Sequence, residues 1–472
     1  MPEVCYLPAV EQARLLRDRE ISAVELLDAH LQQIERVNPR VNAVVTLVPD
    51  LARERAAAAD RASGSGESLG ILHGLPIAHK DLALTAGIRT TQGSPIFADW
   101  IPEESSLFVE RLWAAGAVPL GKTNTPEFGA GSQTFNPVFG ATRNPYELTR
   151  TCGGSSGGAA VALACGMVAL ADGSDMGGSL RNPASFCNIV GFRPAPGRVP
   201  TWPSLDPWSP LPVEGPLGRT VADVALLLSA MAGPDDRCPL SLPEDGSMFA
   251  GSLEHDTNGT RVAWSPDAGG LPVEPAVTAA LAPARAVLES LGCEVVDAFP
   301  DLSDAGEIFQ VLRAVAFETG LGTLYDDHRD ELKETIRWNI ELARRLSLSD
   351  VARANRRWSE LRERVRRFFE SHDFLALPTV QVPPFDLDAE WPRGVAGVPM
   401  ETYIDWMRSC SDITVTGCPA ISVPAGFTPE GLPVGLQLVG RFRDDLGVLR
   451  LAHAFEGATR VGERRPVLAD EQ

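Results

Sequence analysis

Two glycine- and serine-rich clusters lie close together between residues 151 and 198, and they constrain this chain more than any other stretch. The first cluster is GGSSGG at 153–158, and the second is DMGGS at 175–179. An Ala- and Val-rich run at 159–164 follows the first cluster, so the spacing allows a helix out and a short strand back. Because glycine lets a backbone turn sharply or approach a ligand closely, we expect both clusters to bring hydroxyl and N–H groups to one reacting group.

Two simpler interpretations compete with this one. Flexible linkers are rich in Gly and Ser, but they lack the apolar runs that follow and separate these clusters. The segment Gly116–Thr123 also matches the P-loop pattern G-x-x-x-x-G-K-T. A P-loop needs a strand before it and a helix after it, whereas here a helix precedes, the intervening residues are typical of a short strand, and Pro126 opposes a long helix. A nucleotide-binding protein is kept as an alternative.

Charge and composition exclude several classes of partner. The 472 residues carry a formal net charge of −20, which disfavours nucleic acid and anionic membranes as partners. We see no apolar run long enough for a transmembrane helix and no secretory leader, so a cytoplasmic protein is expected. The eight cysteines include no C-x-x-C pair, and no histidine spacing is typical of a metal site. Neither a metal nor another cofactor is expected.

Apolar strand patterns alternate with helical patterns along the whole chain, which predicts an α/β fold with helices on both faces of a sheet. Ser22 and Glu25 have the spacing of a capping box at the start of one helix. We expect helices at 9–38 (as a pair), 51–62, 105–115, 220–231, 275–292, most of 304–372, and 444–458. The expected strands include 41–48, 75–80, 292–296, 374–379, 420–424 and 435–440.

The segment 344–367 is rich in arginine and at first suggests a nucleic-acid surface. Glutamates interleave with the arginines, however, and Glu360–Arg364 and Glu363–Arg367 have the spacing of ion pairs along a helix. A solvated, ion-paired helix is the better interpretation.

Four motifs occur in an order that resembles the amidase signature family. They are GLPIAHKD at 74–81, GKTNTPEF at 121–128, the two clusters within 151–198, and GCPAISVP at 417–424. The resemblance covers roughly residues 20–460. It implies a single amidase domain over 1–472, with a mixed central sheet of about eleven strands sandwiched between layers of α-helices. The signature core would cover about 70–230, and a variable region that shapes the substrate site about 235–415.

The resemblance also assigns roles, motif by motif. It implies that Ser179 is the nucleophile, that Ser155 relays the proton and follows a cis peptide bond, and that Lys80 is the base. The oxyanion hole would be formed by the backbone N–H groups of Met176, Gly177, Gly178 and Ser179. Supporting roles would fall to Ser156, Asp175 and Arg181, and the substrate cavity would be lined by Gly129, Ala130, Gly131 and Ser132.

Elementary chemistry agrees with a lysine base. No histidine triad is apparent in the sequence, and lysine can act as a base if burial or nearby positive charge holds it neutral. His79 precedes Lys80 on the expected strand, and side chains alternate along a strand. His79 should therefore face away from any site that Lys80 faces.

The expected activity is hydrolysis of a small-molecule amide, carbamate or ester, with the acyl group carried on Ser179. One alternative within the same family is the glutaminase subunit of a tRNA-dependent amidotransferase. That subunit usually continues its second cluster as GGSIRQP, whereas this chain has GGSLRNP and a tryptophan-bearing, Pro-rich loop at 201–210. A stand-alone amidase is therefore favoured, and a homodimer is possible by analogy with the family.

Overall fold

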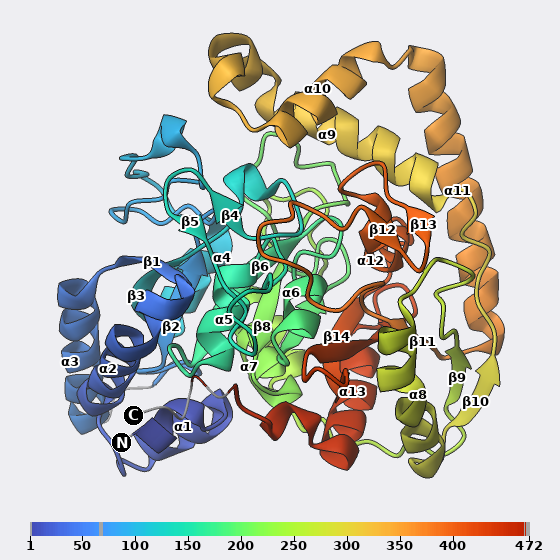
Figure 1. Cartoon of the computed structure of the whole chain (residues 1–472). Helices are drawn as coiled ribbons and strands as arrows, with labels where there is room; N and C mark the ends of the chain where they lie inside the picture. Colours follow the sequence, from blue (N-terminus) through green and yellow to red (C-terminus); the bar gives the residue numbers. More distant parts are fainter. Residues whose placement is uncertain (1, 66–68, 467, 469–472) are drawn as a thin grey trace.

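The computed structural model describes residues 2–65, 69–466 and 468. Within these residues, eleven strands form one mixed sheet in the order β1-β3-β2-β6-β8-β7-β14-β15-β11-β9-β10. The sheet takes strands from both ends of the chain, and helices surround it (Figure 1). The predicted α/β class with about eleven strands is confirmed.

The strands of this sheet are short, and most are buried. Every residue of β2, β3, β11 and β15 is buried, as expected where helices cover both faces of a sheet. The bounds are β1 Val44–Leu47, β2 Pro76–Lys80, β3 Val118–Thr123, β6 Leu170–Asp175, β7 Val190–Arg193, β8 Val213–Gly218, β9 Arg261–Trp264, β10 Glu294–Asp297, β11 Phe374–Pro378, β14 Ala420–Phe427 and β15 Pro433–Gly440. Two small hairpins add β4 Phe135–Asn136 with β5 Gly140–Ala141, and β12 Gly394–Val395 with β13 Val398–Pro399.

The helices fall close to their predicted positions. The capping box at Ser22 and Glu25 is present, with the Glu25 N–H 3.1 Å from Ser22 Oγ. The bounds are α1 Ala9–Arg17, α2 Ala23–Val41, α3 Pro49–Ser65, α4 Leu107–Ala114, α5 Gly157–Ala164, α6 Arg181–Phe186, α7 Val221–Met231, α8 Pro275–Ser290, α9 Ala305–His328, α10 Glu334–Arg345, α11 Leu348–Ser371, α12 Arg408–Thr414 and α13 Asp445–Thr459. In the described residues, no helix has the length and apolar character needed to cross a membrane.

The middle of the sheet brings the two glycine–serine clusters together. β2 pairs in parallel with β6, and β6 pairs antiparallel with β8. The first cluster leads into α5, which is buried throughout, and the second cluster follows β6 directly. Lys80 ends β2 and Asp175 ends β6, so the ends of two neighbouring parallel strands place their side chains at one edge of the sheet.

The helices α9, α10 and α11 form an arm at the top and right of the view in Figure 1. α9 packs against both α10 and α11, and it also contacts α12. The predicted Glu363–Arg367 ion pair is present at 2.8 Å. The predicted Glu360–Arg364 pair is wrong, because Arg364 reaches across to Asp304, 3.0 Å away, at the start of α9.

The conformation of residues 116–123 contradicts the nucleotide-binding alternative. Gly121 and Lys122 lie inside β3, paired with β1 and β2, rather than in a loop ahead of a helix. The Lys122 ammonium is buried and donates to the hydroxyl of Thr85 at 2.8 Å. Because this ammonium is buried inside the sheet and already hydrogen-bonded, it cannot contact the phosphates of a bound nucleotide. The match to the P-loop pattern is therefore coincidental.

Candidate active site

Lys80 is the centre of a hydroxyl cluster. It is 1 % exposed, and its Nζ lies 2.7 Å from Ser155 Oγ, 3.0 Å from Ser156 Oγ and 3.0 Å from Ser174 Oγ. No carboxylate forms an ion pair with Lys80 among the described residues. A lysine in these surroundings is a hydrogen-bonded amine rather than half of a salt bridge.

The electrostatics of this site favour the neutral amine. Burial lowers the pKa of Lys80 to about 8, although the carboxyl groups of Glu214, Asp175 and Asp172 act in the opposite direction. Burial penalises the charged form because water no longer solvates the ammonium. With a pKa of about 8, roughly a tenth of Lys80 is unprotonated at pH 7 and about half at pH 8, and the unprotonated amine is the form that can act as a general base.

Ser155 joins the two glycine–serine clusters. The peptide bond between Gly154 and Ser155 is cis, in agreement with the resemblance, and Ser155 is buried. The N–H of the next residue, Ser156, donates to the backbone carbonyl of Ser179 at 3.2 Å. This contact holds the second cluster against the first.

Ser179 lies in the turn between β6 and α6 and keeps part of its surface accessible. Its hydroxyl makes no hydrogen bond to any of the described residues, so the step from Ser155 to Ser179 is not closed by a hydrogen bond. Within the same part of the chain, the N–H groups of Gly177 and Ser179 have no acceptor. The turn therefore presents a free hydroxyl and free N–H groups together.

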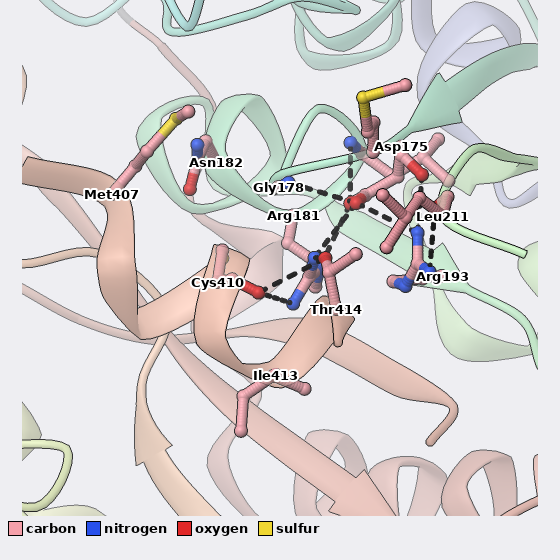
Figure 2. A network of polar contacts seen from close by, with 12 residues as sticks. Asp175, Gly178, Arg181, Asn182, Arg193, Leu211, Met407, Cys410, Ile413 and Thr414 are labelled. Atoms are coloured by element: carbon pink, nitrogen blue, oxygen red, sulfur yellow. Dashed lines mark hydrogen bonds and ion pairs between the residues drawn. The ribbon is translucent and has the colours of Figure 1, made fainter. Parts of the chain in front are cut away.

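Asp175 is the centre of the polar network that fixes this turn (Figure 2). Its carboxylate accepts from Arg181 Nη2 at 2.8 Å and Nε at 3.0 Å, and from Arg193 Nη1 at 3.3 Å. All three side chains are fully buried. Burial alone would raise the pKa of Asp175, but the two guanidinium groups hold it well below its usual value. Asp175 therefore stays ionised and fixes the start of the turn.

Gly178 departs from its predicted role. Its N–H donates to Asp175 Oδ1 at 2.9 Å, so in this structure it is not available to a substrate oxyanion. Its φ of 119° favours glycine, and a Cβ there would lie 2.7 Å from both Asn182 Nδ2 and Cys410 Cβ. Gly178 shapes the turn, while Met176, Gly177 and Ser179 stay as the predicted oxyanion donors.

His79 faces away from the serines, as strand alternation predicts. Its Nδ1 lies 2.5 Å from Asp172 Oδ2, and Trp113 Nε1 donates to its Nε2 at 3.0 Å. Because an indole N–H only donates, His79 carries its proton on Nδ1 and donates to Asp172. The other oxygen of Asp172 accepts the backbone N–H of Lys80 at 3.0 Å. His79 therefore braces the strand that carries the lysine.

The segment 129–132 lies over the hydroxyl cluster. A Cβ on Gly129 would lie 3.4 Å from Ser155 Oγ, and φ is +69° at this residue. Ser132 Oγ contacts Met407 Sδ at 2.8 Å and accepts from Asn182 Nδ2 at 3.2 Å. Ala130 packs in a small apolar cluster with residues of α9 and α10, and Gly131 lies near Lys333. Their predicted role as the cavity lining stays a prediction.

Sequence reasoning missed two groups beside Lys80. Ser174 pairs directly with Glu214 across the β6–β8 ladder, so both side chains lie on one face. Burial raises the pKa of Glu214, although the lysine acts against this shift. The alternation of side chains along β6 could have indicated Ser174, but only the pairing of β6 with β8 brings Glu214 to the site.

Comparison with known proteins agrees with the motifs. The family model described as Amidase matches residues 25–449. An acylamidase of Rhodococcus erythropolis is 36% identical, with 98% of this chain and 97% of that protein covered. A subunit of the glutamyl-tRNA(Gln) amidotransferase of Moorella thermoacetica is 38% identical, with 99% of each covered.

Solved structures give the same result. A bacterial aryl acylamidase described as an amidase signature enzyme superposes with a TM-score of 0.89 at 30% identity, covering 99% of both chains. A 6-aminohexanoate cyclic dimer hydrolase, solved with its substrate, has a TM-score of 0.89 at 29% identity, with 98% of this chain and 99% of that chain covered. The chain belongs to the amidase signature family and is an amide-hydrolysing enzyme.

Proposed function

We propose that this chain is a stand-alone amidase that cleaves a linear amide through an acyl-enzyme on Ser179. The observation that supports this most directly is the contact between Lys80 Nζ and Ser155 Oγ at 2.7 Å, beneath the turn that carries Ser179. A buried amine, a relay hydroxyl and an accessible hydroxyl are the parts that base-activated nucleophilic catalysis requires.

The hydrogen bonds around Lys80 fit a neutral amine. Ser156 Oγ donates to the carbonyl oxygen of Ser174 at 3.4 Å, so it accepts from Lys80. A neutral amine has two N–H donors and one lone pair. Donation to the hydroxyls of Ser156 and Ser174 leaves the lone pair free to accept the proton of Ser155.

The proposed reaction has two halves. In the first, Ser155 passes its proton to Lys80 and takes the proton of Ser179, whose Oγ attacks the amide carbonyl. The proton returns along the same path to the leaving amine, and the acyl group stays on Ser179. In the second half, water attacks the ester with the roles reversed. The N–H groups of Met176, Gly177 and Ser179 would stabilise the tetrahedral oxyanion, at about 3–4 kcal/mol for each well-placed donor.

The test combines kinetics with direct detection of the intermediate. Purified protein is assayed on para-nitroanilides of short acyl groups, and rapidly quenched samples are digested and analysed by mass spectrometry. We expect release of para-nitroaniline and an acyl mass on the peptide that contains Ser179. Ser290→Ala, at an exposed serine of α8, is the matched control and should behave like the wild type. An acyl mass on another residue would overturn the assignment.

The glutaminase alternative has a specific observation in its favour, namely an amidotransferase subunit that is 38% identical to this chain. The two functions differ in what the isolated chain does. A stand-alone amidase hydrolyses a simple aryl amide without any partner protein. By contrast, the glutaminase component of an amidotransferase would prefer glutamine and would need its partner subunits for full turnover. Assaying the purified chain on both substrates separates them.

The remaining expectations accompany this proposal. A carbamate or ester could replace the amide, because the same tetrahedral chemistry cleaves all three. A cytoplasmic location, a homodimer and independence of nucleic acid, membranes, metals and other cofactors stay predictions from the sequence.

A further inference from the structure

We propose that Arg313 forms a subsite for a carboxylate of the substrate, so that the preferred amide carries a negative charge. This inference deepens the proposed function and rests on it. It starts from the surroundings of the guanidinium, which lies on α9, far in sequence from the signature motifs.

Arg313 is buried without a counter-ion. It is 4 % exposed, and none of the carboxylates in the described residues forms an ion pair with it. The guanidinium carbon lies 4.5 Å from the ring centroid of Phe317 and 5.5 Å from that of Tyr403. Aromatic faces compensate part of the desolvation, but buried charges are usually paired with an opposite charge. The surroundings therefore favour an anion that the protein itself does not supply.

The acidic residues nearest in sequence are already paired. Glu307 on α9 accepts from Arg353 at 3.1 Å, and Glu318 on the same helix accepts from Arg344 at 3.0 Å. Arg344 also pairs with Asp326. Turning either glutamate toward Arg313 would break an existing ion pair, so α9 holds no spare carboxylate for it.

Hydrogen-bond donors outnumber acceptors around Arg313. Arg313 Nε and Nη2 both donate to the hydroxyl oxygen of Tyr403, at 3.1 and 2.5 Å, and Asn339 Nδ2 donates to the same oxygen at 2.7 Å. The Tyr403 O–H donates to none of the described residues. The hydroxyl of Thr335, one turn before Asn339, is buried and has no partner in that part of the chain. A carboxylate, which only accepts, would satisfy several of these donors at once.

The guanidinium also reaches the catalytic turn. Arg313 Nη1 donates to Met176 Sδ at 3.2 Å, and sulfur is a weak acceptor. Met176 is half-buried and begins the turn that ends at Ser179. A Cβ on Gly177 would lie 2.9 Å from Phe309, which places α9 directly over that turn. Because methionine is flexible, a substrate carboxylate could displace its sulfur and take the stronger hydrogen bond.

The binding experiment uses the full chain with Ser179→Ala, so that amides stay intact. Calorimetry measures Kd for para-acetamidobenzoate against para-acetamidobenzamide, and for succinyl para-nitroanilide against its terminal carboxamide. The members of each pair differ only in having a charged carboxylate or a neutral carboxamide, and the two pairs place this group on the amine side and on the acyl side. We expect at least one carboxylate to bind about tenfold more tightly than its carboxamide, since a charge-assisted hydrogen bond replaces a neutral one.

Adding Arg313→Gln should reduce that ratio to within about twofold, and Arg313→Lys should retain an intermediate preference because it keeps the charge. Arg366→Gln, on the exposed side of α11, is the control and should keep the full ratio. A ratio below twofold in both pairs before Arg313 is changed, or a ratio that survives Arg313→Gln, would overturn the inference, and neither result depends on Arg313→Lys folding. Hydrolysis of the neutral amides by the wild type tests the proposed function separately.

Discussion

Two buried arginines show how differently the two halves of this site are built. Arg181 belongs to the network that holds the turn with Ser179, where Asp175, Gln437, the carbonyl of Cys410 and the hydroxyl of Thr414 accept its hydrogen bonds (Figure 2). Arg313 lies over the same turn on α9, with a phenol and a thioether as its acceptors. Both side chains are at least nine-tenths buried, yet of the two only Arg181 has a carboxylate partner among the residues that the structure describes.

This difference suggests two roles: the network around Asp175 holds the turn, and Arg313 contacts the substrate. The network around Asp175 is complete without a ligand, so it can hold the turn in one geometry throughout a catalytic cycle. The donors of Arg313 share one phenol and a thioether, which carry no negative charge, and we infer that a substrate carboxylate supplies it. Rigid, satisfied contacts suit the reacting atoms, whereas unsatisfied donors suit a group that arrives and leaves. The predictions below test this contrast.

The largest effect is expected at the chemistry itself. Ser179→Ala and Lys80→Met should each lower kcat by about 10⁴-fold or more, since removing one member of a catalytic unit costs nearly as much activity as removing all of them. The unfolding midpoint of Ser179→Ala should match that of the wild type, because its hydroxyl makes no hydrogen bond to the described residues. Steady-state kinetics and thermal unfolding measure the two effects. Full activity in either variant would remove the assignment.

The second prediction compares the two arginine sites by stability. Asp175→Asn should lower the free energy of unfolding by about 3–5 kcal/mol, because Arg181 and Arg193 would both lose their buried counter-charge. Arg313→Met should cost about 1 kcal/mol or less without ligand, since it removes a buried charge that lacks an anionic partner. Urea unfolding of both variants measures the difference. Equal losses in the free energy of unfolding would show that Arg313 stabilises the fold as much as the network around Asp175 does.

A third prediction concerns the shape of the turn. Gly178→Ala should destabilise the protein by about 1–3 kcal/mol and lower kcat, because its Cβ would overlap Asn182 and Cys410. Gly259→Ala is a matched control, since φ is +72° there and nothing lies within 4 Å of the added Cβ. The control variant has the strain of a positive φ at a non-glycine residue but no steric overlap, so it should keep full activity. If both variants behaved alike, crowding at the turn would have no role.

The smallest effect is a displacement of the pH profile. Because burial lowers the pKa of Lys80 to about 8, kcat/KM should fall as the pH drops below about 8 and the amine gains its proton. Glu214 acts to raise that pKa when it is ionised, so Glu214→Gln should move the acid limb to lower pH. The displacement should be small, because burial raises the pKa of Glu214 to about 8 and leaves it partly protonated. Glu54→Gln, at an exposed residue of α3, should leave the profile in place. A shift toward higher pH in Glu214→Gln would contradict this electrostatic account.

Much of the fold and the reacting groups could be predicted from the sequence, because the signals are local. Apolar periodicity predicted the helices and strands, and the Ser22–Glu25 spacing predicted a cap that the structure contains. The contact between Lys80 and Ser155 followed from motifs that lie 75 residues apart. Strand alternation separated His79 from Lys80 correctly, since neighbouring side chains on a strand face opposite ways.

The errors have physical causes. Arg364 was expected to pair with Glu360 along its own helix, but a neighbouring helix offered Asp304 at 3.0 Å. Gly178 was expected to donate to substrate, but its N–H donates to the buried carboxylate of Asp175, 2.9 Å away. In the first case a partner distant in sequence outweighed the spacing, and in the second a carboxylate within the turn itself took the N–H.

By itself, the sequence determined the class of fold, and its motifs gave the prediction of which groups react, since periodicity and short motifs are encoded within a few residues. Tertiary structure alone decided which groups surround them. Ladder pairing between β6 and β8 brings Glu214 to the lysine, and the packing of α9 over the turn brings Arg313 to Met176. Burial and charge depend on contacts between distant segments, so the pKa of Lys80 and the unpaired guanidinium of Arg313 emerge only when the chain is folded.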